Sequence, residues 1–534
     1  MPLRSFGYSA LLLPGSVLAL SAFVACGGKN EATAVAMGGA GSIIHGGSGP
    51  TASAGSGDLT SGAGGTSSGG SGGAAQAGGS GGSAGAGGAS GGSAGSAGNS
   101  TDGYPTSCDD IGMAPTIPPA CSTVLATKTA TDGKLTDEAV LDTQAIQTAI
   151  TACPAGMSVK LAVDGANNAL LSGPISLKSG VTLWIDSGVT LFASRNPRDF
   201  DAKPNACSTG TGGASNCLPL IAANSTVGSG VMGEGTIDGR GGEPIIGQEP
   251  LTWWQLNDKD HLNGNLTAPR LIQTSGGKNF TIYQTHFQNS PKFHIVIGTP
   301  GYTVWGITVN TDPTSPNTDG VDPSTGNGLI AYNTISTGDD NVAIKGSTST
   351  PINNIIVAHN HFFRGHGMSI GSETNSGVQN VKVCDLTLDG TNNGLRIKSD
   401  ASSGGLVQTV SYNDVCMRGV KDPFVFDAYY SSATGTLIPN FQDISLHSVH
   451  VTGTGATNNT FRGYDATHIT TISLDNVIVD DAGSATYKDQ DTSFTFGPGP
   501  VNLDPATGTG ITITKSITGS DAPKDCTNVW VPAP

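Results

Sequence analysis

Short β-rich segments recur through the second half of the chain at a spacing that few folds can accommodate. They begin at Phe280, Tyr302, Gly328, Asn354, Val381, Val407, Ile444 and Ile469. In each segment apolar residues alternate with polar ones, and Asn, Gly, Asp and Thr fill the gaps. Most steps span about 22 to 27 residues, with no helical pattern of ten residues between segments. This period predicts a parallel β-helix, in which every coil buries its inward side chains against its neighbours.

The same period argues against the main alternatives. A β-sandwich would place its strands about 8 to 12 residues apart, and βαβ units would need helices between the strands. A helical bundle is disfavoured because charged residues make up only 12% of the chain and aromatic residues 6%. One helical stretch, residues 142–153, lies just before the coils and has apolar residues at helical spacing. It predicts a short helix that caps the open N-terminal end.

Composition divides the chain into three parts. Residues 1–26 combine an early basic residue, an apolar run and a small residue before Cys26, which predicts an export signal. The position of Cys26 is typical of bacterial lipoproteins that are anchored to the outer membrane; ordinary signal cleavage and secretion is the alternative. Residues 27–103 are almost entirely Gly, Ser, Ala and Thr and predict a disordered linker. Residues 104–534 are predicted to form the β-helix domain.

Charge and cysteine content narrow the expected partners. The net charge of −16 argues against a nucleic-acid partner, which would require a basic face. An acidic substrate would need a local basic cluster to hold it. Eight cysteines follow Cys26, and in an exported chain they predict disulfides, with Cys207–Cys217 and Cys384–Cys416 as the expected local pairs. The chain has no CxxC motif, so a structural metal cluster is not expected.

Four polar clusters interrupt the repeat at intervals of about one coil. They are Asn317–Asp319, Gly338–Asp340, Gly365–Gly367 and Arg396–Lys398. The steps between them are 21, 26 and 30 residues. Residues one coil apart stack at roughly 4.8 Å, so the clusters are expected to converge on one external face. Adjacent Asp339 and Asp340 cannot both point outward from a regular strand, so Gly338 is expected to form a turn or bulge that presents both.

The chemistry of these clusters favours glycoside hydrolysis. That reaction needs one protonated acid and one ionised base, and the three convergent carboxyl groups can supply both. Crowding of like charges raises the pKa of one of them and couples their titration. His366 can exchange a proton with the acid. Arg396 and Lys398 lie two residues apart on a strand, so their side chains point the same way. The planar guanidinium of Arg396 and the ammonium of Lys398 could both bind a sugar carboxylate.

In this order, the motifs NTD, GDD, GHG and RIK resemble those of the polygalacturonases, family 28 of the glycoside hydrolases, from about Cys121 to the end of the chain. Three flanking stretches, Gly233–Gly239, Asp319–Pro323 and Gly394–Ser399, are similar to the bacterial branch. The resemblance implies an all-β, right-handed parallel β-helix of the pectin-lyase-like kind. It also implies inverting hydrolysis of the α-1,4-galacturonosidic bonds of polygalacturonan (pectin), with no cofactor and no metal.

The resemblance further implies a role for each residue of the motifs. Asp339 would be the general acid, and His366 would assist it. Asp319 and Asp340 would activate the attacking water. The residues that would bind galacturonate are Asn317, Arg396, Lys398 and Tyr430, with Tyr429 as the alternative to Tyr430.

Several other polar and aromatic residues are expected to be structural. An isolated Asp in a β-helix turn usually caps backbone groups. This role is expected of Asp238, Asp322 and Asp385. His359 and His361 lie within a strand pattern and are expected to be structural or merely exposed, and Trp253–Trp254 is expected to pack rather than to stack on sugars.

Other interpretations of the sequence stay open. A pectate lyase shares the fold but relies on calcium held by Asp clusters, whereas here the acids accompany a His and an RIK triplet. A non-enzymatic, carbohydrate-binding surface β-helix would have no reason to concentrate these side chains at coil spacing. Within the family, a rhamnogalacturonan or xylogalacturonan hydrolase is the alternative. The sequence does not separate endo from exo action, and the protein is expected to be a monomer.

Overall fold

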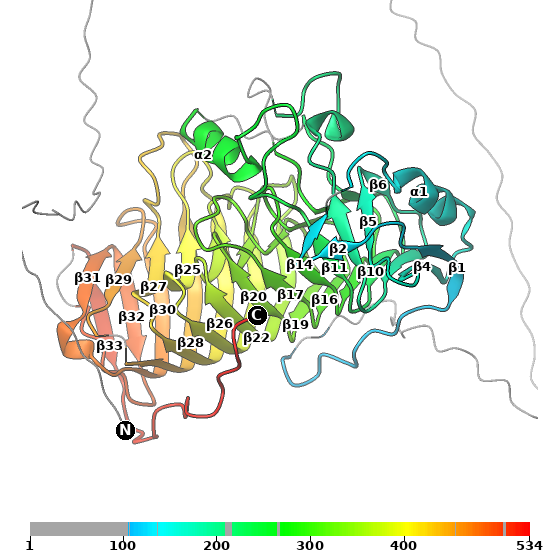
Figure 1. Cartoon of the computed structure of the whole chain (residues 1–534). Coiled ribbons are helices and arrows are strands. Elements are labelled where there is room, and N and C mark those ends of the chain that lie inside the picture. The colour runs from blue at the N-terminus through cyan, green and yellow to red at the C-terminus, as the bar shows by residue number, and fades with distance from the viewer. Residues whose placement is uncertain are drawn as a thin grey trace, which may run out of the picture. The chain divides into compact units, whose positions relative to one another are not determined.

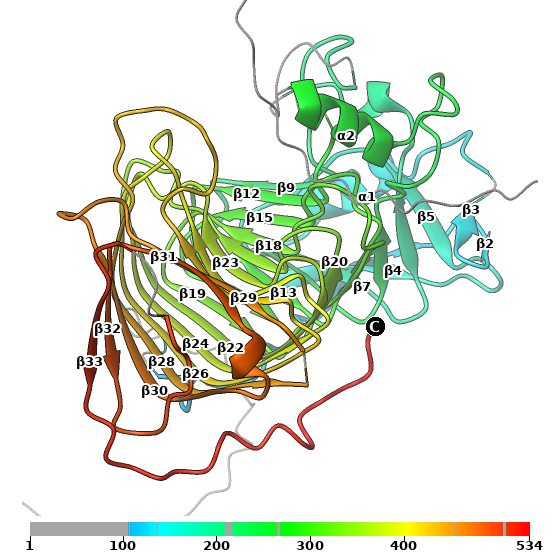
Figure 2. The same ribbon diagram turned by 90° about the vertical axis from the view of Figure 1, so that its left-hand side faces the viewer.

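Successive strands of the computed structural model wind into stacked coils, which confirms the β-helix (Figures 1 and 2). The expected export signal, Cys26 and the linker up to residue 103 lie outside the described residues. The structure describes Pro105 and residues 107–135, 137–208, 216–263, 268–453, 455–505 and 509–534.

One sheet contains eleven parallel strands, each from a different coil. Corresponding residues of neighbouring coils pair in register, so that Val321 lies opposite Val342, and Val342 opposite Met368. The strands are β6 (Ile175–Ser176), β9 (Ile221–Asn224), β12 (Ile272–Ser275), β15 (Ile295–Gly298), β18 (Val321–Pro323), β21 (Val342–Ile344), β23 (Met368–Gly371), β25 (Asn393–Lys398), β27 (Asp422–Asp427), β29 (Asn458–Arg462) and β31 (Thr486–Gln490).

The other large sheet has 20 strands and consists of two parallel ladders that merge. The first ladder is β1 (Ala120–Leu125), β4 (Met157–Ala162), β7 (Val181–Ile185), β10 (Gly230–Met232), β13 (Thr281–Tyr283), β16 (Tyr302–Trp305) and β19 (Gly328–Ala331). The second is β5 (Ala169–Ser172), β8 (Thr190–Ala193), β11 (Thr236–Asp238), β14 (His286–Gln288), β17 (Thr308–Asn310) and β20 (Thr334–Thr337).

From residue 352 onward, one long strand per coil pairs in both ladders. These strands are β22 (Ile352–Arg364), β24 (Val378–Asp389), β26 (Leu406–Arg418), β28 (Asn440–Thr452) and β30 (Thr470–Val479). In β22, for example, the residues before His359 pair with β19 and those after it pair with β20. His359 lies between the two parts and has a positive φ, as Asp385 has in β24. The shorter β32 (Thr492–Phe496) and β33 (Thr512–Lys515) end the sheet, and β2 (Ala130–Thr131) pairs separately with β3 (Lys134–Leu135).

The inward side chains of the coils stack into one apolar core. In β25 the alternation is plain, since Leu395 and Ile397 are fully buried in this core. Arg396 and Lys398 alternate with them and therefore point to the other face of the sheet. The eleven-stranded sheet thus buries one row of side chains and presents the next row on its outer face.

The predicted capping helix is α1 (Thr143–Ala152), which buries Ile146 and Ile150 against the first coils. A second helix, α2 (Trp253–Asn263), was not predicted, because its largely polar sequence has no apolar stripe. Fully buried Trp253 packs α2 against the core, as expected of that residue. Two 3₁₀ turns are present, η1 (Pro197–Phe200) and η2 (Ala482–Ser484). The coils also begin earlier than the repeat that starts at Phe280 indicated, because β1 already pairs in parallel with β4.

The described cysteines form four disulfides, and only one of the two expected pairs is among them. Cys207–Cys217 is confirmed, but Cys384–Cys416 is wrong. Although their strands are neighbours, Cys416 lies opposite Thr387, three residues along from Cys384. That offset is about 10 Å, which exceeds the reach of a disulfide. The other bridges are Cys108–Cys384, Cys121–Cys153 and Cys416–Cys526.

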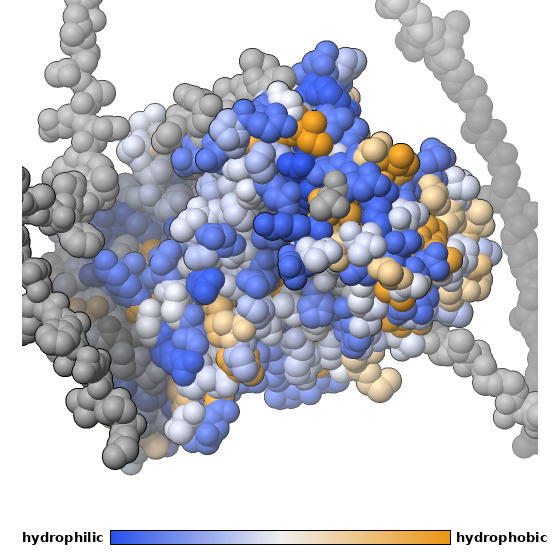
Figure 3. Space-filling view, viewed as in Figure 1, coloured by the Kyte–Doolittle hydropathy of each residue, from blue (hydrophilic) through white to orange (hydrophobic). Residues whose placement is uncertain are grey.

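The face shown in Figure 3 is largely hydrophilic, and hydrophobic residues are scattered over it. Among the residues described, no helix has the length and apolar character needed to span a membrane.

Candidate active site

The polar clusters lie in the turns that lead into the eleven-stranded sheet. Asp319, Asp340 and His366 each stand two residues before a strand residue of one paired row, which is Val321, Val342 and Met368. They therefore occupy equivalent positions in three successive coils. This register explains the spacing of 21 and 26 residues and confirms that the clusters converge.

Gly338 allows both neighbouring aspartates to be presented. It lies in a bend between β20 and β21, and a Cβ at this position would come within 2.1 Å of the carbonyl oxygen of Ser315. The backbone N–H of Asp340 donates to Oδ1 of Asp339 at 2.9 Å. The bend predicted around Gly338 is thus present, and it leaves no room for a side chain there.

Asp339 and His366 form the exposed part of the cluster. His366 Nδ1 lies 2.9 Å from Asp339 Oδ1, and both side chains are partly accessible to solvent. Burial is the largest single influence on Asp339 and raises its pKa, but the hydrogen bond with His366 and the charges of His366 and Lys398 together outweigh it, so the pKa of this carboxyl is lowered. Asp339 is therefore ionised in the free protein.

Asp340 is buried and held by three donors. Ser369 Oγ donates to its Oδ1 at 2.7 Å, Arg396 Nη1 to the same oxygen at 3.2 Å, and Lys398 Nζ to Oδ2 at 2.8 Å. Burial alone would raise the pKa of Asp340, but the charges of Lys398 and Arg396 prevail and hold it well below its usual range. A fully buried carboxylate is thereby kept ionised.

Asp319 shares its surroundings with two charged residues that sequence analysis did not assign to the site. Lys345 Nζ lies 3.8 Å from Asp319 Oδ2, and Asp322 is buried nearby in β18. Burial, reinforced by Asp322 and Asp339, raises the pKa of Asp319 well above its usual value. Burial also raises the pKa of Asp322, to about 7. The pKa is thus raised for these two carboxyl groups, whereas it is lowered for Asp339.

The expected structural role of Asp322 is therefore wrong. Its side chain caps no described backbone group, and its Oδ1 is buried without a hydrogen-bond partner. Strand alternation was the available signal, since Val321 and Pro323 face the core and Asp322 must face outward. Lys345 could have been found from coil spacing, because it occupies the same row as Gly371 and Lys398.

Of the two candidate tyrosines, Tyr430 is the one that lies beside the basic pair. Its ring centroid is 5.2 Å from Arg396 Cζ and 5.1 Å from Lys398 Nζ. Tyr429 instead stacks on Tyr464, with ring centroids 5.4 Å apart. Asn317, with a positive φ, precedes Asp319 and has a buried Oδ1 without a partner among the described residues.

Other residues expected to be structural have structural contacts. Asp238 accepts a hydrogen bond from the backbone N–H of Arg240 at 2.8 Å. Asp385 caps no described backbone group, contrary to expectation, and instead pairs with the side chain of His359, whose Nδ1 lies 2.8 Å from it. His361 Nδ1 lies 2.7 Å from Thr387 Oγ1. These contacts belong to the 20-stranded sheet or its edge.

One oxygen or nitrogen from each of Asp339, Asp340 and His366 lies within 4.8 Å of the others, a spacing that could suit a metal ion. The donor set does not fit one well, however. Both oxygens of Asp340 already accept hydrogen bonds from Arg396 and Lys398, whose positive charges would repel a cation. The arrangement suits proton transfer and the binding of an anion.

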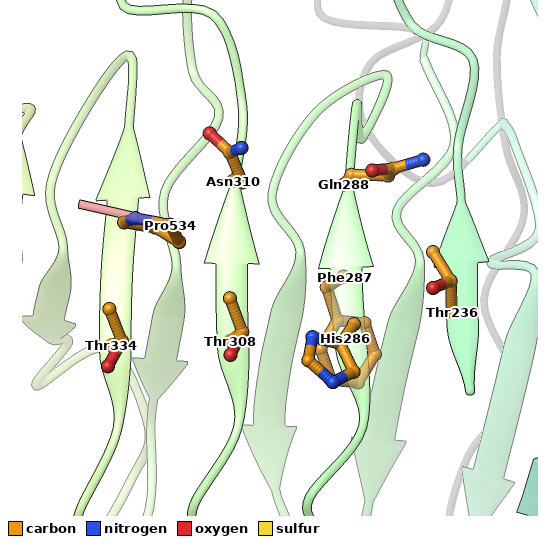
Figure 4. A pocket seen from close by; sticks show the side chains of 8 residues that line it. All are labelled: Thr236, His286, Phe287, Gln288, Thr308, Asn310, Thr334 and Pro534. Carbon is orange, nitrogen blue, oxygen red and sulfur yellow. The ribbon is translucent and has the colours of Figure 1, made fainter. Parts of the chain in front are cut away.

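A hollow of about 440 Å³ lies elsewhere, on the outer face of β11, β14, β17 and β20 (Figure 4). None of the predicted site residues lines it. Its lining includes one histidine and no Asp, Glu, Lys or Arg, so it lacks the acid and base of a hydrolase. The lining residues are Thr236, His286, Phe287, Gln288, Thr308, Asn310, Thr334 and Pro534.

Comparison with known proteins places this geometry in a family. The model of "Glycosyl hydrolases family 28" matches residues 153–495. A polygalacturonase of Ralstonia nicotianae is 43% identical over 476 residues, which cover 77% of this chain and 90% of the relative. An endo-polygalacturonase of Pectobacterium carotovorum is 46% identical over 313 residues, 58% of this chain and 77% of the relative. The solved polygalacturonase from Erwinia carotovora matches with a TM-score of 0.66 and 39% identity, covering 73% of this chain and 100% of that one.

Proposed function

The chain belongs to family 28 of the glycosyl hydrolases, and on this premise we propose that it cleaves the α-1,4-galacturonosidic bonds of polygalacturonan with inversion. The observation that carries the proposal is the convergence of Asp319, Asp339 and Asp340 with a basic pair over consecutive coils. The carboxyl groups supply proton transfer. Arg396 and Lys398 supply affinity for a substrate that has a carboxylate on every ring.

In the proposed mechanism, Asp339 protonates the glycosidic oxygen as the bond to the anomeric carbon breaks. Asp340, with Asp319, orients a water molecule on the opposite side of the ring and accepts its proton as the new C–O bond forms. Asp339 is ionised in the free protein, so it must gain its proton when the substrate enters. An anionic substrate that excludes water raises the pKa of a neighbouring carboxyl, and His366 lies within hydrogen-bond reach to exchange that proton.

The basic pair retains donors for the substrate. Only one nitrogen of Arg396 donates to Asp340, and Lys398 uses one of its three N–H donors there. The remaining donors can bind a galacturonate carboxylate while Tyr430 covers the pair. Asn317 is proposed to bind the substrate through its side-chain amide.

A product analysis tests the reaction type. Digestion of polygalacturonic acid should release saturated reducing sugars, and chelation should leave the rate nearly unchanged, because the proposed steps use only side chains. The measurement is a reducing-sugar assay together with ultraviolet absorbance. Absorbance from an unsaturated product, with a requirement for calcium, would instead identify a lyase.

Internal cleavage is the proposed mode of action, because an endo-polygalacturonase is among the relatives with 46% identity. Early products sized by chromatography should span many lengths. Exclusive release of monomer or dimer would indicate exo action. Polygalacturonan, rhamnogalacturonan and xylogalacturonan compared side by side would identify the backbone that is cleaved.

We further propose that the protein is exported and that lipid on Cys26 anchors it to the outer membrane, with residues 27–103 as a tether. A flexible chain of this composition would reach about 50 Å on average. Cys26→Ser should then move active protein from the membrane fraction to the soluble fraction, measured as activity after fractionation. A wild-type protein that is already soluble and carries no lipid would contradict the anchor.

A further inference from the structure

Arg270 lies in line with the acids along the axis of the coils. It stands two residues before Ile272, which pairs with Ile295, and Ile295 pairs with Val321. Arg270 thus occupies in its coil the position that Asp319 occupies two coils later. Phe293 has this position in the coil between them. The backbone confirms the alignment, since Leu271 N–H donates to Phe293 O and His294 N–H to Asp319 O.

The guanidinium of Arg270 has few hydrogen bonds and no ion pair with a described carboxylate to offset the cost of its burial. Its Nη1 donates to Gln273 at 2.7 Å, but its Nε is buried with no hydrogen-bond partner, and no described carboxylate lies within ion-pair distance. Burial lowers the pKa of Arg270, and the more distant Asp322 and Asp319 only partly offset this. Every other described arginine that is not exposed pairs with a carboxylate. These are Arg195, Arg198, Arg240, Arg396 and Arg462.

An unpaired, half-buried cation costs free energy unless a ligand completes its surroundings. The side chains around Arg270 repeat those of the basic pair beyond the acids. Arg270 Cζ lies 5.4 Å and Lys292 Nζ 4.9 Å from the ring centroid of Phe293. Lys292 is buried beneath this ring, so only Arg270 is partly accessible to a ligand. An Arg, a Lys and an aromatic ring therefore stand on each side of the carboxyl cluster.

We propose that Arg270 binds a second carboxylate of the same substrate chain, on the other side of the cleavage point from Arg396 and Lys398. This inference rests on the proposed function. A galacturonan that lies along the coils passes Arg270, then Asp319 and the other acids, then Arg396. Each ring of the substrate carries a carboxylate. One cationic site can therefore bind a ring on one side of the cleaved bond, while the other site binds a ring on the opposite side.

Purified oligogalacturonates of increasing length test the inference. Arg270→Ala should lower kcat/KM about 10- to 100-fold on oligomers that span both cationic sites. The loss should fall mainly on KM and should vanish on the shortest oligomer that is cleaved. The preferred cleavage position should also shift along end-labelled oligomers, since the variant binds the rings on the Arg270 side of the cleaved bond more weakly. Arg270→Lys should retain part of the affinity.

Arg418→Ala is the matched control, because this exposed arginine pairs with Asp389 on the 20-stranded sheet and should leave all these values unchanged. Equal losses on every oligomer length, or no loss, would overturn the inference. Calorimetric binding of a long oligomer to Asp339→Asn, with and without Arg270→Ala, gives a readout that needs no turnover. A wild-type protein that binds but does not cleave would refute the proposed function alone, whereas an affinity independent of Arg270 would refute this site alone.

Discussion

Asp339→Asn should lower kcat on polygalacturonate by about 10²- to 10⁴-fold, the usual contribution of a general acid. The amide matches the carboxyl in size and can still hydrogen-bond to His366, but it has no proton to transfer. Substrate binding should change little, since Asp339 makes none of the proposed contacts to the galacturonate carboxylates. Steady-state kinetics should therefore show a loss in kcat with KM nearly constant.

The chain offers a matched control for this variant. Asp385 forms a similar Asp–His pair with His359, at 2.8 Å, on the 20-stranded sheet. Asp385→Asn should leave both kcat and KM unchanged. Near-normal turnover in Asp339→Asn would assign the acid to another residue, and Asp319, whose pKa is raised, would be tested next.

Lys398→Ala should lower kcat/KM about 10- to 150-fold, because a charge-assisted contact contributes about 1.5–3 kcal/mol. Two contacts of Lys398 contribute to this loss in kcat/KM, so the loss has two parts. One part is the lost partner for the substrate's carboxylate, which should appear in KM and shrink on methyl-esterified substrate. The other arises because Lys398 also donates to Asp340. Kinetics on both substrates separate the two parts.

The second part should appear as a pH effect. Lys398 is the main charge that lowers the pKa of Asp340, so its removal raises that pKa. If Asp340 must be ionised to accept a proton, the acidic limb of the kcat profile should move to higher pH. Lys398→Arg should largely restore the profile, and Lys382→Ala, which removes an exposed lysine of β24, should not alter it. An unshifted profile with equal losses on both substrates would contradict both roles of Lys398.

Coil spacing was enough to predict the centre of the site. Asp319, Asp340 and His366 stand at equivalent positions of successive coils, so a repeat read along the sequence becomes proximity in space. The outward direction of Arg396 and Lys398 followed from strand alternation. These predictions depended only on a period of about one coil and on the two-residue repeat of a strand.

The wrong or missing predictions concern positions where the same local sequence is compatible with more than one structure. An isolated aspartate such as Asp322 usually caps a turn, and only its strand register reveals that it faces the acids. The Cys384–Cys416 pairing depended on a three-residue register that the sequence does not display. The helix α2 has a polar sequence, and its Trp253 joins the apolar core, which only the folded coils create.

The Cys108–Cys384 disulfide determines how the coils would bear mechanical load. A pull on the chain that precedes Cys108 would ordinarily unwind a solenoid from its first coil. The bridge instead passes the force to β24, 276 residues further along, and bypasses the coils between them. A pull on the proposed tether would thus enter the domain at β24, beside the coil that holds Arg396, and would not unwind the N-terminal coils in sequence.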